Sequence, residues 1–289
     1  MTGKLSAMRL ALLTLLALLA FAGNSLLCRA ALAHTSIDAA SFTTVRLVSG
    51  ALVLWLLARL HFAKTAAVGQ GNWLSALALF GYAAGFSFAY TQLDTGIGAL
   101  ILFGAVQVTM IGYGIWRGER LALWQWLGLG LALAGLALLL WPGEAAAALP
   151  AALLMLVAGI AWGLYSIRGK GAGHPLQVTA GNFLLAIPMT LLLSMFWLNQ
   201  MHWDAMGLMY ALLSGIVTSG LGYAIWYSVL PFLTSPIAAS LQLSVPLLAA
   251  FAGVWLLQEP FTMRLFFAAL AISLGILLVT LTKKTLDNN

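Results

Sequence analysis

The chain has 289 residues, of which 63% are hydrophobic and only 7% are charged. A soluble domain has about 25% charged residues, so this composition excludes a soluble protein and indicates an integral membrane protein. The single cysteine, Cys28, excludes an intrachain disulfide and a cysteine-based metal site. Membrane insertion and contact with anionic lipid explain the net charge of +6, with no need for nucleic acid as a partner.

Apolar segments follow one another along the whole chain, each with the roughly 20 residues that a membrane-spanning helix needs. They are rich in Leu and Ala and longer than the strands of a membrane barrel. The first segment is too long for a signal peptide and lacks a small-residue cleavage site, so we expect it to be retained. We therefore predict an all-helical membrane bundle with spans at residues 7–30, 39–60, 72–92, 95–116, 121–141, 150–168, 177–197, 206–230, 236–257 and 262–281.

The first predicted span contains small and polar residues, Gly23, Asn24 and Ser25, near its outer half. Small residues let membrane helices pack closely, and the glycine fits this role. The Asn24 amide costs several kcal/mol if it stays unsatisfied in hydrocarbon. Two interpretations stay open for Asn24, a hydrogen bond between helices and a contact to substrate.

The second predicted span carries a charged residue, Arg46. Charged residues at such depth usually face the bundle interior or a wet cavity. One interpretation is that Arg46 extends to the outer headgroups or pairs with Asp38 or Asp94. The other is that Arg46 binds a carboxylate of the substrate.

Aromatic rings recur on the third and eighth predicted spans. Tyr82, Phe86 and Tyr90 are spaced at i, i+4 and i+8, which places them on one helix face. Tyr82 and Phe86 match Tyr223 and Tyr227 at an offset of 141 residues. Such a stripe is typical of packing or of an interfacial belt, but glycines between the rings also favour the lining of a cavity.

Further polar and aromatic residues lie inside other predicted spans. A proline in a membrane helix frees a carbonyl and allows a kink, which would suit a gate, although many such prolines are merely tolerated. These residues are Trp162 and Tyr165 in the sixth span, Gln107 in the fourth, and Gln242, Ser244 and Pro246 in the ninth.

Residues 93–140 are restated at residues 233–280 with a constant offset of 140, which carries Glu119 to Glu259 and Gly135 to Gly275. The sequence therefore predicts a repeat at 1–145 and a second at 146–289. With five spans in each half, the second repeat enters the membrane in the opposite orientation, a design typical of transporters. Glu119 and Glu259 each lie in a short elbow between two spans, where we expect them to cap the helix that follows.

Lysine and arginine are distributed unevenly over the loops. With ten spans and a cytoplasmic N-terminus, only Arg29 and Arg264 lie on the outer side and Arg46 lies within a span. This bias predicts that both termini are cytoplasmic. The residues on the inner side are Lys4, Arg9, Arg59, Lys64, Arg117, Arg120, Arg168, Lys170, Lys283 and Lys284.

The two elbows resemble the paired signature of the EamA branch of the drug/metabolite transporter superfamily, with GERL at 118–121 and QEPFT at 258–262. Arg46 and Leu47 resemble the family's second-span arginine motif, and Trp162-Gly163 its Trp-Gly at the start of a repeat. The first half has Ala22-Gly23 there, which weakens a role for an aromatic residue at that position. The resemblance implies a ten-span basket that opens alternately to either side of the inner membrane, with a central cavity from spans 1, 3, 4, 6, 8 and 9. The length, Asn24 and the aromatic spans are most similar to exporters of aromatic amino acids.

Export of aromatic or bulky neutral amino acids is the leading hypothesis, because aromatic rings offer stacking area and amides can hold a zwitterionic backbone. The alternative is proton-coupled efflux of drugs or other metabolites, although every Asp and Glu lies at the end of a predicted span. The four histidines lie in loops or at span ends, so we expect neither a membrane enzyme nor a metal or other cofactor. The repeat argues against a structural protein, and the oligomeric state is left open. The predicted substrate-binding residues are Asn24, Tyr82, Phe86, Tyr90, Gln107, Trp162, Tyr165, Tyr223, Trp226, Tyr227, Gln242 and Ser244, and the predicted gating or structural residues are Arg46, Pro246, Glu119 and Glu259.

Overall fold

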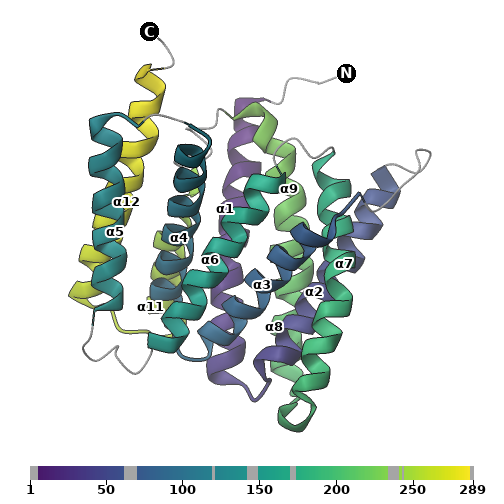
Figure 1. Ribbon diagram of the computed structural model, residues 1–289. Helices are drawn as coiled ribbons and strands as arrows, with labels where there is room; N and C mark the ends of the chain where they lie inside the picture. The colour runs from purple at the N-terminus through teal and green to yellow at the C-terminus, as the bar shows by residue number, and fades with distance from the viewer. Residues whose placement is uncertain are drawn as a thin grey trace.

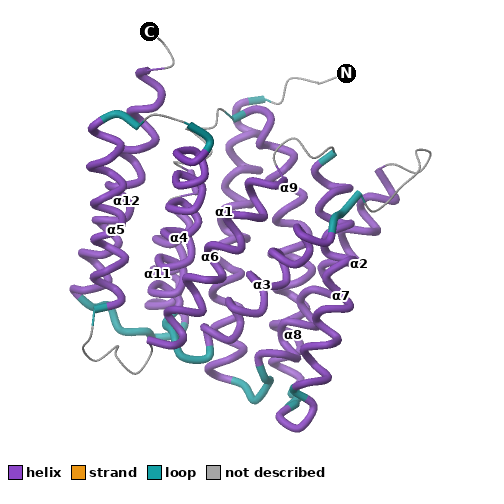
Figure 2. The backbone as a smooth tube through the Cα atoms, in the orientation of Figure 1, coloured by secondary structure: helices purple, strands orange, loops and turns teal. Residues whose placement is uncertain are grey.

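The computed structural model describes residues 6–61, 70–118, 121–141, 149–169, 174–233, 241–242 and 244–286. Within these ranges the chain forms helices and no strands (Figure 2). The helices are α1 Ala7–His34, α2 Ala39–His61, α3 Trp73–Tyr90, α4 Thr95–Trp116, α5 Leu123–Leu140, α6 Leu149–Gly169, α7 Pro175–Phe196, α8 Ala205–Leu213, the π-helix η3 Ser214–Leu221, α9 Gly222–Val229, α11 Ser244–Leu256 and α12 Met263–Leu286, with short 3₁₀ turns η2 Leu198–Gln200 and η4 Leu230–Phe232.

Seven helical segments in the described residues are long and apolar enough to cross a membrane, with Ala205–Phe232 counted as one. Three shorter apolar helices fall in the remaining predicted spans, at Leu123–Leu139, Ser244–Leu256 and Met263–Val279. The helices alternate in direction, so α1 begins and α12 ends at the same end of the bundle (Figure 1). The prediction of a multi-pass helical membrane protein is confirmed.

Helix pairs that are far apart in the sequence form the bundle (Figure 1). On one side α5 packs along α12, and on the other α2 packs along α7. Between them, α6 contacts α3 and α4, while α1 contacts α9 and α11. The central helices α1, α3, α6 and α9 carry most of the predicted site, and the outer pairs enclose them.

The predicted eighth span contains a π-helix that the sequence pattern does not predict. η3 runs from Ser214 to Leu221 between α8 and α9 and packs against α2. A β-carbon on Gly215 would overlap the Ser49 hydroxyl and the backbone oxygen of Arg46. Only glycine therefore allows this approach, which brings the π-helix against the turn of α2 that carries Arg46. π-Helical turns are frequent at functional sites.

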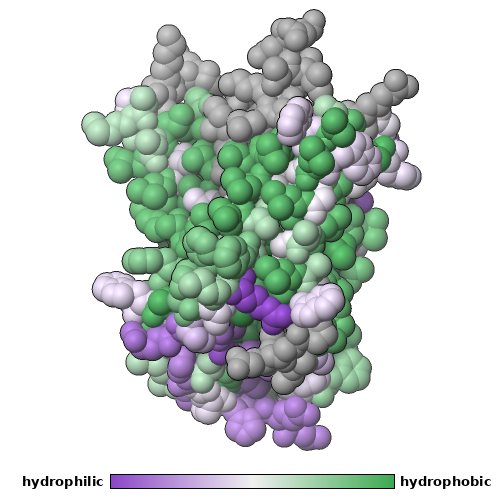
Figure 3. Space-filling model, turned by 90° about the vertical axis from the view of Figure 1, so that its left-hand side faces the viewer, coloured by the Kyte–Doolittle hydropathy of each residue, from purple (hydrophilic) through white to green (hydrophobic). Residues whose placement is uncertain are grey.

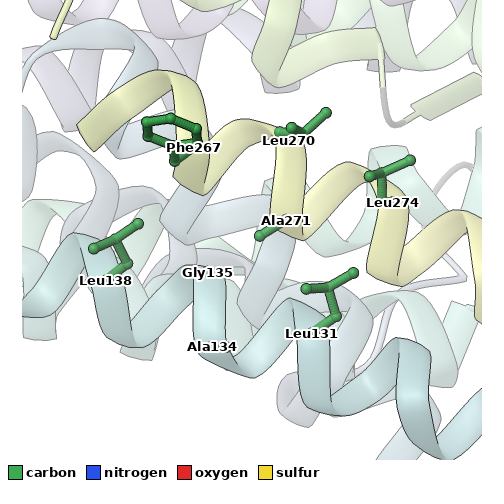
Figure 4. Close-up of a pocket in the computed structure, with 8 residues that line it drawn as sticks. All are labelled: Leu131, Ala134, Gly135, Leu138, Phe267, Leu270, Ala271 and Leu274. Atoms are coloured by element: carbon green, nitrogen blue, oxygen red, sulfur yellow. The ribbon is translucent and has the colours of Figure 1, made fainter. Parts of the chain in front are cut away.

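A broad apolar belt covers the side of the bundle formed by α5 and α12 (Figure 3). Leu127 and Leu133 on α5, and Phe267 and Leu270 on α12, are exposed there. In a membrane helix such side chains face lipid rather than water. A shallow apolar groove of about 340 Å³ lies between these two helices (Figure 4). Its lining residues are Leu131, Ala134, Gly135, Leu138, Phe267, Leu270, Ala271 and Leu274.

Candidate functional site

Three aromatic rings from three helices meet in the centre of the bundle. The Trp162 ring on α6 lies 4.7 Å from the Tyr82 ring on α3 and 5.2 Å from the Tyr223 ring on α9, measured between centroids. Trp162 therefore lies between the two tyrosines that the sequence repeat relates. Ring pairs at these separations stabilise each other beyond the area that they bury, by about 0.5–1.5 kcal/mol.

The stripe of rings on α3 has the geometry predicted from its spacing. Tyr82 and Phe86 lie 5.4 Å apart, and Phe86 and Tyr90 lie 4.7 Å apart. Tyr90 is at the far end of the stripe, where its hydroxyl donates to the Thr95 carbonyl at 3.1 Å and its ring lies against Gly98. The contacts of Tyr90 are thus those of a packing residue at the junction of α3 and α4.

The remaining predicted rings surround this centre. Tyr165 stacks on Trp162 at 5.3 Å, and Tyr227 lies 6.5 Å from Tyr223. Trp226 contacts Phe21 of α1 at 5.8 Å, and Phe21 also contacts Tyr223 at 5.7 Å. α1 therefore does contribute an aromatic ring, but from Phe21, the residue before the Ala22-Gly23 pair.

Asn24 joins three helices through hydrogen bonds. Its amide nitrogen donates to the Tyr82 hydroxyl at 3.3 Å, and its amide oxygen accepts from Ser214 at 2.7 Å and from Thr218 at 3.1 Å. In this conformation Asn24 therefore forms hydrogen bonds between helices, which is the first of its two interpretations. The Asn24 oxygen is fully engaged with the π-helix.

Arg46 neither extends to a headgroup layer nor pairs with a carboxylate, so the first of its two interpretations, with Asp38 or Asp94 as partner, is contradicted. The residue is only 1% exposed. Its Nε donates to the Ser219 hydroxyl at 3.2 Å and its Nη2 to the Tyr82 hydroxyl at 2.9 Å. The third nitrogen, Nη1, is buried without a hydrogen-bond partner in the described structure.

The two carboxylates predicted as possible partners of Arg46, Asp38 and Asp94, are engaged elsewhere. Asp38 accepts hydrogen bonds from the backbone of Ala40 and Ser41 at 2.9 Å, and so caps the start of α2. Asp94 pairs with Arg29 at 3.2 Å. Asp38 thus satisfies the start of a helix and Asp94 a second arginine, which leaves the Arg46 charge to the rings and hydroxyls around it.

Glu259 caps a helix, but not the one predicted. Its two carboxylate oxygens accept from the backbone nitrogen of Thr95, at the start of α4, at 2.9 Å each, and one also accepts from the Thr95 hydroxyl at 2.8 Å. Arg29 lies 3.5 Å from the same carboxylate. The helix that follows Glu259 is capped by Thr262, which accepts from Leu265. Glu119 lies outside the described residues.

Glu259 can reach α4 because the elbow turns sharply after α11. Gln258 has a φ of 56°, in the left-handed region that ends many helices, and the Glu259 amide donates back to the Gly253 carbonyl at 3.2 Å. Burial raises the pKa of the Glu259 carboxyl above its ordinary value, while the hydrogen bonds from Thr95 lower this pKa in part.

The polar residues predicted on the fourth and ninth spans do not join the central cluster through hydrogen bonds in the described structure. Gln107 is buried in α4, and its amide has no hydrogen bond to the described residues. The Ser244 hydroxyl donates to the Leu241 carbonyl at 2.6 Å, and Gln242 is half-buried beside it. Pro246 lies within α11, and residues 241–242 before it are also helical, while residue 243 between them is outside the described residues. The kink expected at Pro246 stays a prediction.

The central rings pack directly against one another in this conformation. Neither the groove at α5 and α12 nor a smaller pocket of about 220 Å³ near His34 and Tyr210 is lined by the predicted binding residues. Sequence reasoning also missed Thr218 and Ser219, the π-helix partners of Asn24 and Arg46. The polar stretch from Ser214 to Ser219 inside an apolar span is the signal that could have identified them.

The chemistry of this cluster suits the binding of a small molecule. It combines aromatic surface, hydroxyl groups and one guanidinium, and the described residues contain no group of three His, Cys, Asp or Glu that could hold a metal ion. Its members come from α1, α2, α3, α6, η3 and α9. A ligand held here would therefore contact helices from both halves of the chain.

Comparison with known proteins defines the class. Residues 149–281 match the EamA-like transporter family. The fold also matches a crystal structure with a TM-score of 0.67 and 17% sequence identity, over 96% of this chain and 99% of the other. Residues 149–281, slightly less than half of the chain, therefore resemble EamA-like transporters, and the long apolar helices indicate a multi-pass membrane protein.

Two relatives are similar to a larger part of the chain. The chain is 57% identical to the uncharacterized protein PA1977 of Pseudomonas aeruginosa over 271 residues, which is 94% of each protein. It is 25% identical to the uncharacterized transporter YoaV of Bacillus subtilis, over 72% of this chain and 74% of that protein.

Proposed function

We propose that this transporter exports amino acids, aromatic or bulky neutral ones above all, and related metabolites from the cytoplasm across the inner membrane by alternating access. The observation that carries the proposal is the position of Trp162 between Tyr82 and Tyr223. A cluster of rings with a few polar groups in the centre of a transporter provides apolar and stacking area for an aromatic side chain. In this respect the chain resembles the YddG-type exporters of aromatic amino acids.

The alternating mechanism requires two related halves, residues 1–145 and 146–289, and the helix packing supports such a relation. If the two halves are exchanged, α3 corresponds to the eighth-span helices α8, η3 and α9, α4 corresponds to α11, and α6 corresponds to α1. The contacts of α6 with α3 and α4 then correspond to contacts of α1 with the eighth-span helices and with α11, and all of these contacts are present. The pairs α2 with α7 and α5 with α12 map onto themselves. This is the pattern expected of ten spans in two inverted repeats.

Individual residues of α5 and α12 support the same relation. The repeat offset of 140 carries Gly135 to Gly275 and Gly128 to Ala268. A β-carbon on Gly135 would lie 3.1 Å from the Ala268 carbonyl oxygen, and one on Gly275 would lie 2.5 Å from the Gly128 carbonyl oxygen. Exchange of the two halves therefore converts one contact into the other, as a twofold axis between the helices would require.

Transport driven by the substrate gradient alone fits the position of the acidic residues. In the described structure the carboxylates of Asp38, Asp94, Asp204 and Glu259 all lie at helix ends. Proton relays in membranes commonly run through such groups at membrane depth. We therefore favour a facilitator with both termini in the cytoplasm, the orientation that the lysine and arginine distribution predicts.

Proton-coupled efflux of drugs or other metabolites is the second candidate, and one observation favours it. The Glu259 side chain is only 8% exposed, it connects α4 to the elbow between α11 and α12, and burial raises the pKa of its carboxyl. A carboxylate with these properties has the chemistry of a coupling group.

Uptake into proteoliposomes with a panel of labelled amino acids, with and without a pH gradient, tests both candidates. Saturable transport of phenylalanine or tryptophan that does not respond to the pH gradient supports facilitated export. A rate that rises with the proton gradient favours the second candidate. Absence of transport for every amino acid in the panel contradicts the proposal.

A further inference from the structure

We infer that Arg46 and Tyr82 form a binding site for a single carboxylate, so that the substrate class is an aromatic or bulky apolar monocarboxylate whose amino group is dispensable. The inference deepens the proposed function and rests on it for the direction of transport. It starts from two hydrogen-bond donors in the centre of the bundle that have no acceptor among the described residues.

The first donor is the Nη1 of Arg46. It is buried without a hydrogen-bond partner in the described structure, although Nε and Nη2 of the same side chain are both bonded. The guanidinium lies over the Tyr82 and Phe86 rings, 5.2 and 5.0 Å from their centroids. Such contacts offset part of the cost of the buried charge, but they neither neutralise it nor satisfy Nη1.

The second donor is the hydroxyl of Tyr82. Its oxygen accepts from Arg46 Nη2 at 2.9 Å and from the Asn24 amide at 3.3 Å. A tyrosine hydroxyl has two acceptor positions and one proton to donate, and both acceptor positions are in use. The hydroxyl proton thus has no acceptor among the described side chains, and the same is true of Nη1 of the neighbouring Arg46.

A carboxylate is the group that matches this pair. It carries one negative charge and two oxygens, one for each free donor, and charge-assisted bonds of this kind are about twice as strong as neutral ones. Among the other arginines of the described chain, Arg59, Arg168 and Arg264 lie at helix ends, and Arg29 pairs with Asp94 and Glu259. One positive charge at this depth favours a monoanion over a phosphate dianion.

The site offers fewer partners for the amino group of an amino acid. The Asn24 oxygen is already used by Ser214 and Thr218, and the described carboxylates are at the helix ends. An ammonium would be left with the faces of rings such as Trp162, whose attraction is weaker than a carboxylate bond. The site therefore recognises the carboxylate and the ring of the ligand, and an amino group adds little to the affinity.

The ligands for the test are four molecules with one ring in common: phenylalanine, phenylalaninamide, phenethylamine and 3-phenylpropionate. Binding to the full-length purified protein is measured by ligand-dependent thermal shift, and transport by uptake of labelled 3-phenylpropionate into proteoliposomes. We expect 3-phenylpropionate to bind within a few-fold of phenylalanine. The two ligands without a carboxylate should bind at least about tenfold more weakly, the loss expected for a hydrogen bond to a charged group.

The decisive variant is Tyr82→Phe, which keeps the ring and removes only the hydroxyl. It should weaken 3-phenylpropionate about tenfold and leave phenethylamine unchanged. Arg46→Gln should abolish the preference for the acid. Arg59→Gln is the matched control, because this arginine lies in the last turn of α2 and contacts Trp55. The control should retain the preference.

Several outcomes overturn the inference: no saturable binding of 3-phenylpropionate, equal binding of acid and amide, or equal losses for all ligands in Tyr82→Phe. Failure of the proposed function would give a different experimental result. Binding and uptake of 3-phenylpropionate without transport of any amino acid would contradict amino-acid export and support the carboxylate site. Transport of phenylalanine and phenylalaninamide at equal affinity would support export and remove the carboxylate site.

Discussion

Glu259, in the elbow between α11 and α12, caps the first turn of α4 by accepting the backbone N–H of Thr95 with both carboxylate oxygens at 2.9 Å. Asp94, the residue in the ordinary capping position of α4, makes no such bond. The cap therefore ties an element of the second half of the chain to a helix of the first. Arg29 extends this link to α1 through its contacts with Asp94 and Glu259.

Glu259→Ala should destabilise the folded protein by about 1–3 kcal/mol, because it leaves the buried N–H of Thr95 without an acceptor. Glu259→Gln keeps one acceptor oxygen and should lose less. By the repeat, Glu119→Gln should behave in the same way. Thermal unfolding and membrane protein levels measure the loss. Normal protein levels with an altered substrate preference would contradict a structural role.

The stability that Glu259 contributes should depend on pH. Burial raises its pKa in the folded protein above the ordinary value of 4.5, so the folded state binds a proton more tightly than the unfolded state. This contribution is fully present below pH 4.5 and is lost as pH rises through the folded pKa. The melting temperature of the native protein, relative to Glu259→Gln, should therefore rise on acidification from pH 7. A pH-independent difference would contradict this assignment.

Both termini should be cytoplasmic, since this orientation leaves only Arg29 and Arg264 of the loop arginines and lysines outside. Fusion of topology reporters at Asn289, and at the loop around residue 145 as a control on the opposite side, measures the orientation. A periplasmic C-terminus would remove one span and with it the inverted repeat.

Trp162→Ala, Tyr82→Ala and Tyr223→Ala should each remove apolar and stacking area, a loss on the order of 1–3 kcal/mol and roughly 5- to 150-fold in affinity for an aromatic substrate. Transport of phenylalanine and threonine, normalised to folded protein in the membrane, separates binding from packing. Phe267→Ala is the matched control, because this ring is 55% exposed on the lipid face. Equal losses for both substrates, or none, would leave the central rings as scaffold.

Gly215→Ala should destabilise the protein by about 1–3 kcal/mol, because the added methyl group overlaps Ser49 and the Arg46 backbone. Gly112→Ala in α4 is the control. No atom lies within 4 Å of the corresponding position there, so alanine should be neutral or slightly stabilising. Thermal unfolding compares the two. Equal effects would show that the close contact between α2 and η3 is unimportant.

Sequence alone determined the features that depend on local periodicity and composition. Apolar length predicted the helices, and the spacing of Tyr82, Phe86 and Tyr90 placed their rings in one stripe, because residues at i, i+4 and i+8 share a helix face whatever surrounds the helix. The elbow motif at residues 258–262 resembles the EamA-like transporter family, whose match covers residues 149–281.

Only the tertiary structure decided the partners of the polar residues. Arg46 bonds to Ser219, 173 positions away, and Glu259 bonds to Thr95, 164 positions away. Which groups meet over such separations depends on how each helix is rotated and packed, and on the π-helix that turns Ser219 toward α2. The sequence offered nearby carboxylates for Arg46 and the next helix for Glu259. Neither is the partner observed, because close packing at Gly215 and the sharp turn at Gln258 bring more distant groups within hydrogen-bond reach.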